Sequence, residues 1–291
     1  MSTVKARSEL AATELKKTPP DSRVETVGRL LFGDQDWQTK FQQVGDRYAM
    51  FADLEGPVGA DQGYTDSPQW KHLKTLDTNW RNVVIYCSPD LEETRDSSGK
   101  LTKIHDNARS EDIDVGDILW DVKQETIVGK EYSTLAETKI DQKVGGEPAG
   151  ERKKIAETIT FHPLYLKEVE KKNYLLFTDD LLKKVAHPNL WRTVKSFCKK
   201  RLRKADDCTS MDALMGLEGT LHHEFFHLGL FGNWLDRPDQ LEAYYWKWNT
   251  IHKLDNNPEN YALLALAIQV IVEKNHSVDK NGKITAPRTG L

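Results

Sequence analysis

The chain has 291 residues, of which 38% are hydrophobic and 30% charged, and its formal net charge is −4. This length and composition describe a globular chain with a sizeable core, and the modest charge favours neither nucleic acid nor an anionic membrane surface as a partner. The longest apolar run, from Tyr261 to Val272, is too short to cross a bilayer and predicts a buried helix.

The cysteine content and the first residues bear on the compartment. Cys87, Cys198 and Cys208 are too few for a disulfide framework, and whether Cys198 pairs with Cys208 is left open. The first twenty residues lack the apolar core of a secretory signal. We therefore expect a cytoplasmic protein, or a secreted one if a leader precedes this sequence. The oligomeric state is left open.

Both ends of the chain are poor in apolar side chains, which predicts flexible segments over residues 1–20 and 276–291. The region 21–150 opens with apolar residues at helical spacing, punctuated by Gly33 and Gly45, and this pattern predicts two or three helices. The stretch WRNVVIYC then predicts a strand. Short β-prone pieces such as DILWDV and ETIVG predict that a hairpin-rich, mixed sheet follows.

The region 151–275 begins with a strand in AETITFHPLYL and has mostly helical periodicity from Lys167 onward. The order of helices, sheet and helices predicts an α+β fold with a mostly helical C-terminal half.

The stretch LHHEFFHLGL carries His223, Glu224 and His227 in the pattern H-E-x-x-H. Apolar residues at spacings of three and four in SMDALMGLEGTLHHEFFHLGL predict one unbroken helix, and Gly229, Gly232 and Asn233 are expected to end it. Residues four apart share a helix face, so the two imidazoles can bind one divalent ion. Glu224 is then placed to act as general base on a water. His222 points about 100 degrees away from His223 and is expected in the core or behind the ligands.

A catalytic zinc ion takes a third protein ligand and a water, and the residues leave this third ligand open. The pattern of third-histidine enzymes fails because Leu230 and Asn233 stand where glycine and histidine are required. Three carboxylates follow in a proline-containing loop, Asp236, Asp239 and Glu242. Each of them, taken alone, also fits an ordinary surface charge.

Four features together resemble the aspzincin, or deuterolysin-like, zinc metallopeptidases and their fungal members. They are H-E-F-F-H, an aspartate about a dozen residues later, an alanine-tyrosine pair, and the segment NNPENYALLALAI. The resemblance covers roughly Thr158 to Val272 and implies a zincin-like fold with a mixed sheet and an active-site helix. The family signature G-T-x-x-D-x-x-Y-G is absent, and His162 replaces a cysteine that is common in relatives.

The resemblance also implies roles for individual residues. Asp239 best matches the family's aspartate ligand, Asp236 is second, and Glu242 would place the chain with the glutamate-ligand zincins. Tyr244 is a candidate hydrogen-bond donor to an oxyanion, although YYWKW at helical spacing equally fits an aromatic core. If the strand before His162 is the sheet edge above the cleft, His162 could face substrate and the edge could bind an extended peptide.

These observations predict zinc-dependent hydrolysis of the amide bond of a peptide or small substrate. A non-proteolytic zinc enzyme acting on a small metabolite or modified peptide is an alternative, with YYWKW and His162 shaping its pocket. A metal-free binding protein on a zincin scaffold is the third hypothesis.

Overall fold

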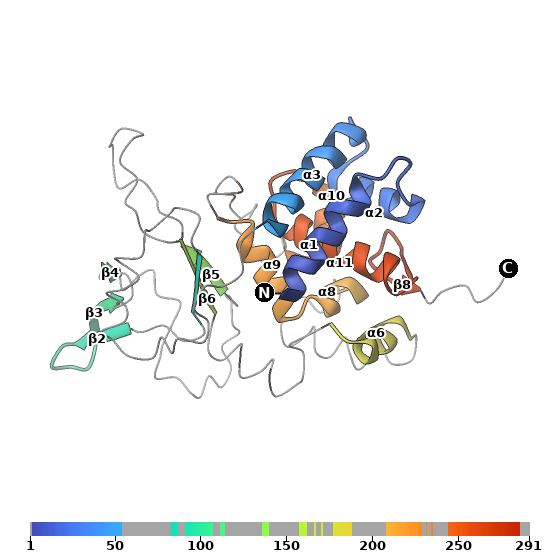
Figure 1. Ribbon diagram of the computed structural model, residues 1–291. Helices are drawn as coiled ribbons and strands as arrows, with labels where there is room; N and C mark the ends of the chain where they lie inside the picture. The colour runs from blue at the N-terminus through green and yellow to red at the C-terminus, as the bar shows by residue number, and fades with distance from the viewer. Residues whose placement is uncertain are drawn as a thin grey trace, which may run out of the picture. The chain divides into compact units, whose positions relative to one another are not determined.

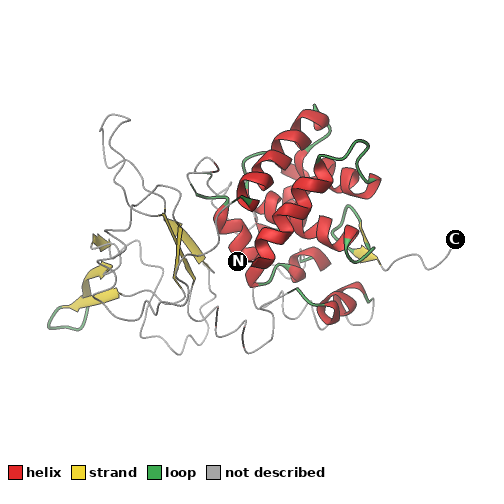
Figure 2. Cartoon of the chain, in the orientation of Figure 1, coloured by secondary structure: helices red, strands yellow, loops and turns green. Residues whose placement is uncertain are grey.

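The computed structural model describes residues 2–53, 83–86, 91–106, 111–113, 136–139, 157–161, 166, 170, 177–187, 208–228, 231, 234 and 244–285. The chain divides into a helical unit and a unit of small sheets, which confirms the α+β class (Figures 1 and 2). The helical unit comprises Met1–Gly56, Val169–His227 and Phe231–Leu291, and the other comprises Pro57–Glu168 with Leu228–Leu230. The helical unit is therefore discontinuous in sequence, unlike the predicted regions 21–150 and 151–275.

The N-terminal segment is helical. Helix α1 spans Ser2–Leu15 and packs against α3 (Trp37–Ala52), α11 (Pro258–Val272) and α9 (Leu217–Phe225). The prediction of a flexible segment over residues 1–20 is wrong. Most of the few apolar residues of α1 are buried together with the polar side chains of Arg7, Ser8 and Glu14, so their small number was a poor guide to order.

One buried arginine shows how α1 is held. Arg7 forms an ion pair of 2.9 Å with Glu218 of α9 and donates a hydrogen bond of 2.8 Å to the side-chain oxygen of Gln269 of α11. Arg7 and Glu218 are both buried. Removing one partner of such a pair strands a charge away from water, so the contact ties α1 firmly to the two helices.

Helix α2 (Ser22–Phe32) and helix α3 confirm the prediction of two or three helices after residue 20. Gly33 ends α2 with a φ of 88°, a conformation that glycine adopts without strain. Gly45 instead lies inside α3, so its predicted role as punctuation is wrong. Gly28 allows α2 and α3 to approach, because a Cβ atom there would lie 2.2 Å from the ring of Phe41.

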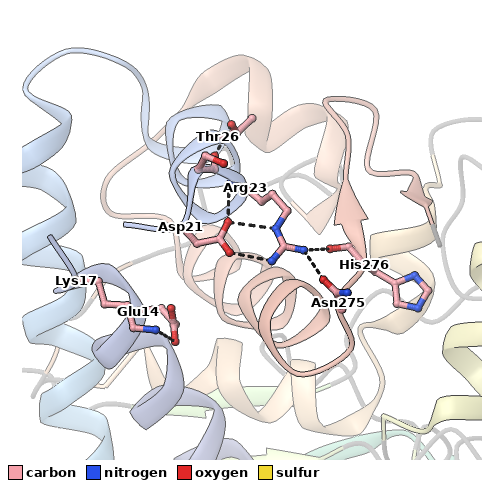
Figure 3. A network of polar contacts seen from close by, with 8 residues as sticks. Glu14, Lys17, Asp21, Arg23, Thr26, Asn275 and His276 are labelled. Carbon is pink, nitrogen blue, oxygen red and sulfur yellow. Dashed lines mark hydrogen bonds and ion pairs between the residues drawn. The ribbon is translucent and has the colours of Figure 1, made fainter. Parts of the chain in front are cut away.

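The start of α2 is joined to the segment that follows α11 (Figure 3). Asp21 caps α2 by accepting a hydrogen bond from the backbone N–H of Arg23, and it also binds the guanidinium of that residue. Arg23 then donates to the side-chain oxygen of Asn275 at 3.0 Å and to the carbonyl of His276. The hydrogen bond from Arg23 lowers the pKa of the Asp21 carboxyl group.

After His276 the chain forms a hairpin of β7 (Ser277–Val278) and β8 (Ile284–Thr285). Val278 and Ile284 are buried, and Gly282 lies so close to Trp246 that a Cβ atom would not fit. The predicted flexible tail is therefore wrong for residues 276–285, whose few apolar side chains are enough to fix the hairpin. Residues 286–291 lie outside the described part.

Helix α11 is the centre of the helical unit. Every residue from Pro258 to Ile271 is buried, which confirms the buried helix predicted over Tyr261–Val272. Asn257 caps the helix through a hydrogen bond from the N–H of Glu259. The other helices that the structure describes in this unit are α6 (Asp179–Ala186), α8 (Ser210–Leu214), α9 and α10 (Trp246–His252). In the described part of the chain, no helix is long and apolar enough to span a membrane.

The described residues of the second unit form two small sheets. In the first, β6 (Glu157–Phe161) pairs in parallel with β1 (Val83–Tyr86) and antiparallel with β5 (Ala136–Lys139). Both strands predicted from the sequence, at WRNVVIYC and ETITF, are confirmed. The condition attached to His162 and to peptide binding, that the second strand is a sheet edge, is not met, because β6 is hydrogen-bonded on both sides. Ile159 and Phe161 are two residues apart on β6, so they lie on the same face of the sheet, and both are buried.

The second sheet is an antiparallel set of β2 (Leu91–Arg95), β3 (Leu101–Asp106) and β4 (Glu111–Ile113). It confirms the hairpin-rich character predicted for this region. The pieces DILWDV and ETIVG lie outside the described residues.

Candidate metal centre

The H-E-x-x-H stretch lies at the end of α9. The predicted unbroken helix is in fact two helices, because the chain turns at Met215 and Gly216 between α8 and α9. Helix α9 also ends at Phe225, before the glycines that were expected to end it. The reason is a tighter last turn, in which the N–H of His227 donates to the carbonyl of Glu224 at 3.1 Å.

The structure brings the three motif residues together, as the spacing predicts. The Nε2 atoms of His223 and His227 lie 3.0 Å apart, and their ring centroids are 4.8 Å apart. One ligand atom from each of His223, Glu224 and His227 lies within 4.8 Å of the other two. His223 and Glu224 are buried and His227 is half-buried, so the cluster lies at the boundary of the core. It is the only such group of three or more metal-binding side chains among the described residues.

The other nitrogen of each imidazole is held by an oxygen. His223 Nδ1 lies 2.8 Å from a carboxylate oxygen of Glu259, and His227 Nδ1 contacts the carbonyl of Trp234. A carboxylate and a carbonyl only accept hydrogen bonds, so each Nδ1 carries the hydrogen and donates it. When both imidazoles are neutral, as ligands to a metal are, each Nε2 atom then carries a lone pair and the two atoms lie 3.0 Å apart.

This arrangement fits a bound cation. Two lone pairs that face each other across 3.0 Å repel, and a positive ion between them removes the repulsion. Two imidazole nitrogens on one tetrahedral zinc ion, each bound at 2.0–2.1 Å, lie about 3.3 Å apart. The observed separation is close to that value. Imidazole nitrogens are also among the ligands that zinc commonly takes in proteins.

Glu259 is a site residue that the sequence reasoning missed. It lies in the first turn of α11 and is buried, as is His223, so their contact is shielded from solvent. A histidine that binds a metal commonly donates its second N–H to such a carboxylate, which fixes the ring and makes it a better ligand. The signal in the sequence was an acidic residue opening an otherwise apolar helix, since a buried carboxylate needs a partner.

Tyr244 lies beside the cluster. Its ring centroid is 5.2 Å from that of His223, with the planes inclined by 34°. The rest of YYWKW divides between two roles: Tyr245 and Trp246 are buried in the core, whereas Trp248 stacks on His252 at 3.9 Å. Tyr244 alone among these aromatic residues has a ring contact with a motif histidine.

His222 belongs to the core, as predicted. Its Nε2 atom lies 2.9 Å from the hydroxyl oxygen of Ser8 of α1, and its ring contacts Tyr48, Phe51 and Phe226. Burial holds the pKa of His222 well below its ordinary value, and the nearby charge of Arg7 lowers it further. His222 is therefore neutral and structural.

Several predicted residues lie outside the described part of the chain. Asp236, Asp239, Glu242 and His162 are all in this group. The third ligand therefore stays a prediction, and the role of His162 loses its support because β6 is not a sheet edge. Cys208 takes part in a disulfide bond, and the other two cysteines are also outside the described residues.

No family model matches the chain, and neither a curated protein nor a solved structure matches it.

Proposed function

We propose that the protein is a zinc-dependent hydrolase of peptide or other amide bonds. The observation that supports this most strongly is the convergence of two oriented Nε2 atoms, 3.0 Å apart, beside the carboxylate of Glu224. Two imidazoles with fixed tautomers form half of a tetrahedral zinc site, and a carboxylate next to them is the usual proton acceptor in hydrolysis. A buried acid behind His223 supports the same conclusion.

In the proposed reaction, His223 and His227 hold the metal, which when bound polarises the carbonyl and lowers the pKa of a water. Glu224 accepts a proton from the attacking water as its oxygen bonds to the carbonyl carbon. Glu224 then delivers that proton to the nitrogen of the leaving amine as the carbon–nitrogen bond breaks. The ring of Tyr244 lies next to His223, which supports its hydroxyl as a donor to the developing oxyanion.

We further propose a zincin-like arrangement of the aspzincin type, with Asp239 as the third ligand. Asp236 and Glu242 are the alternatives that the chain offers near the motif. The resemblance in sequence and the position of Glu259 at the start of α11, in the segment NNPENYALLALAI, support this reading. Alanine variants of the three carboxylates separate them, because only the ligand variant should lose zinc affinity by orders of magnitude.

The test compares wild-type protein with Glu224→Gln, using unfolded casein as substrate. We expect the variant to retain zinc and to lose activity by about two to four powers of ten, because the proton acceptor is gone. Hydrolysis by the variant at the wild-type rate would contradict the mechanism. Inertness of zinc-loaded wild-type protein towards casein would favour an enzyme with one small amide-containing substrate.

A further inference from the structure

Trp234 is held in place by three different parts of the helical unit. The guanidinium carbon of Arg47, from α3, lies 4.6 Å above the centroid of its ring. Tyr261 of α11 contacts the ring at a centroid distance of 5.0 Å, and Phe226, at the end of α9, is stacked at 6.2 Å with only 9° between the planes. The position of Trp234 is therefore set by groups from α3, α9 and α11.

Arg47 is itself held by two hydrogen bonds. Its Nη1 donates a short hydrogen bond to the hydroxyl of Tyr261 and a longer one, of 3.5 Å, to the carbonyl of Asp255. The guanidinium thus binds Tyr261 and Trp234 at once. A planar guanidinium can stack on a ring while its N–H groups donate in the plane, which the ammonium of a lysine cannot reproduce.

Trp234 connects this arrangement with the metal centre. Its carbonyl accepts the Nδ1–H of His227 and so orients the Nε2 atom of that ring towards His223. The chain that follows Trp234 carries the three candidate carboxylate ligands, Asp236, Asp239 and Glu242. A displacement of Trp234 would therefore rotate the imidazole of His227. It would also move the start of the segment that carries the candidate third ligand.

We propose that Arg47 is a positioning residue for the metal centre and acts through Trp234. The inference rests on the proposed zinc site but goes beyond the motif, because Arg47 lies in α3, about 180 residues before His227 in the sequence. It gives the N-terminal helices a role in function: besides covering α11, they hold the backbone group that orients a ligand. Outer partners of metal ligands typically change metal affinity by about 10- to 100-fold when they are removed.

The chain supplies a matched control for the loss of an arginine–tryptophan contact. Arg29 of α2 lies 4.3 Å above the ring of Trp37 and pairs with Glu25, and these contacts involve no motif residue. Arg29→Met and Arg47→Met each remove one guanidinium from a tryptophan face. Only the second removes it from the tryptophan whose carbonyl holds His227.

The experiment measures the zinc dissociation constant of full-length wild-type protein, Arg47→Met and Arg29→Met by competition with a chromogenic chelator, below the melting temperature of each. We expect Arg47→Met to bind zinc about 10-fold more weakly than wild type, the lower end of the range for a direct partner because the carbonyl of Trp234 remains, and Arg29→Met to agree with wild type within about twofold. The visible spectrum of bound cobalt(II) should change in Arg47→Met alone. Arg47→Lys provides the same comparison, with a smaller loss, should the methionine variant fail to fold.

The outcomes separate this inference from the proposed function. Wild-type protein that binds zinc, together with an Arg47 variant of unchanged affinity and cobalt spectrum, would overturn the positioning role and leave the proposed hydrolase intact. Equal losses in Arg47→Met and Arg29→Met would also overturn it, because they would reveal a general effect of helix stability. Wild-type protein that binds no zinc would overturn both proposals.

Discussion

Two neighbouring histidines on α9 lie in opposite surroundings. His222 faces α1 and is enclosed by Ser8 and three aromatic rings, whereas His223 faces Glu259 and the second histidine of the motif. Both are buried. Burial alone therefore does not distinguish a structural histidine from a ligand. In His223 an acceptor orients Nδ1 while Nε2 faces the other motif histidine, and this arrangement is what marks it as a ligand.

The largest expected effect separates the two histidines by substitution. His223→Ala should abolish stoichiometric zinc binding, because it removes one of the two converging Nε2 atoms. His222→Ala should leave zinc affinity almost unchanged but lower the free energy of unfolding by about 2–4 kcal/mol, since it creates a cavity and strands the hydroxyl of Ser8. Zinc titration and chemical denaturation of both variants check this. Loss of zinc binding in His222→Ala, at a temperature where the variant is folded, would show that His222 is needed for the metal centre.

The next effect concerns the groups behind each histidine. Glu259→Gln should weaken zinc binding by about 10- to 100-fold, because an amide polarises His223 less than a carboxylate does. Ser8→Ala removes the corresponding partner of His222 and should change zinc affinity by less than about twofold. The dissociation constants of the two variants measure the contrast directly. Equal affinities in both would mean that Glu259 is simply a buried acid with a hydrogen bond.

Asp212 is a second buried acid that can be compared with Glu259. It lies in a capping box and accepts the backbone N–H groups of Thr209 and Trp246. Burial raises the pKa of Asp212 to about 7. The folded protein therefore binds more protons than the unfolded chain between the ordinary pKa of 3.8 and about 7, and the contribution of Asp212 to stability falls as pH rises through this range.

The measurement for Asp212 is the unfolding free energy of metal-free wild type and Asp212→Asn between pH 4 and 8. The advantage of wild type over the variant should shrink as pH rises towards about 7 and then stay constant. An advantage that grows with pH would show that the backbone donors outweigh burial and keep Asp212 ionised.

The parts of the fold that the sequence predicted are those with a local signal. Helices α2, α3 and α11 and strands β1 and β6 all have periodic or continuous apolar residues. Helix α1 escaped prediction because its order depends on partners far away, such as Glu218 and Gln269, which are 211 and 262 residues from Arg7. No window of the sequence reveals such a contact.

The candidate site divides in the same way. His223, Glu224 and His227 were predicted because a spacing of four on a helix is a local rule. Glu259 lies 36 residues from its histidine, and the carbonyl of Trp234 has no side-chain signature at all. The acidic residue that opens the apolar helix α11 indicates that Glu259 needs a partner, but its pairing with His223 and the contact with the Trp234 carbonyl depend on tertiary packing.

The most direct test of the central claim is the zinc content of protein purified without chelator, together with its melting temperature before and after chelation. We expect about one zinc ion per chain and a lower melting temperature after chelation, because a ligand that binds only the folded state stabilises it. His223→Ala should show neither. A zinc content near zero in wild type, with no uptake when zinc is added and no change on chelation, would contradict the proposed zinc site and favour a metal-free binding protein.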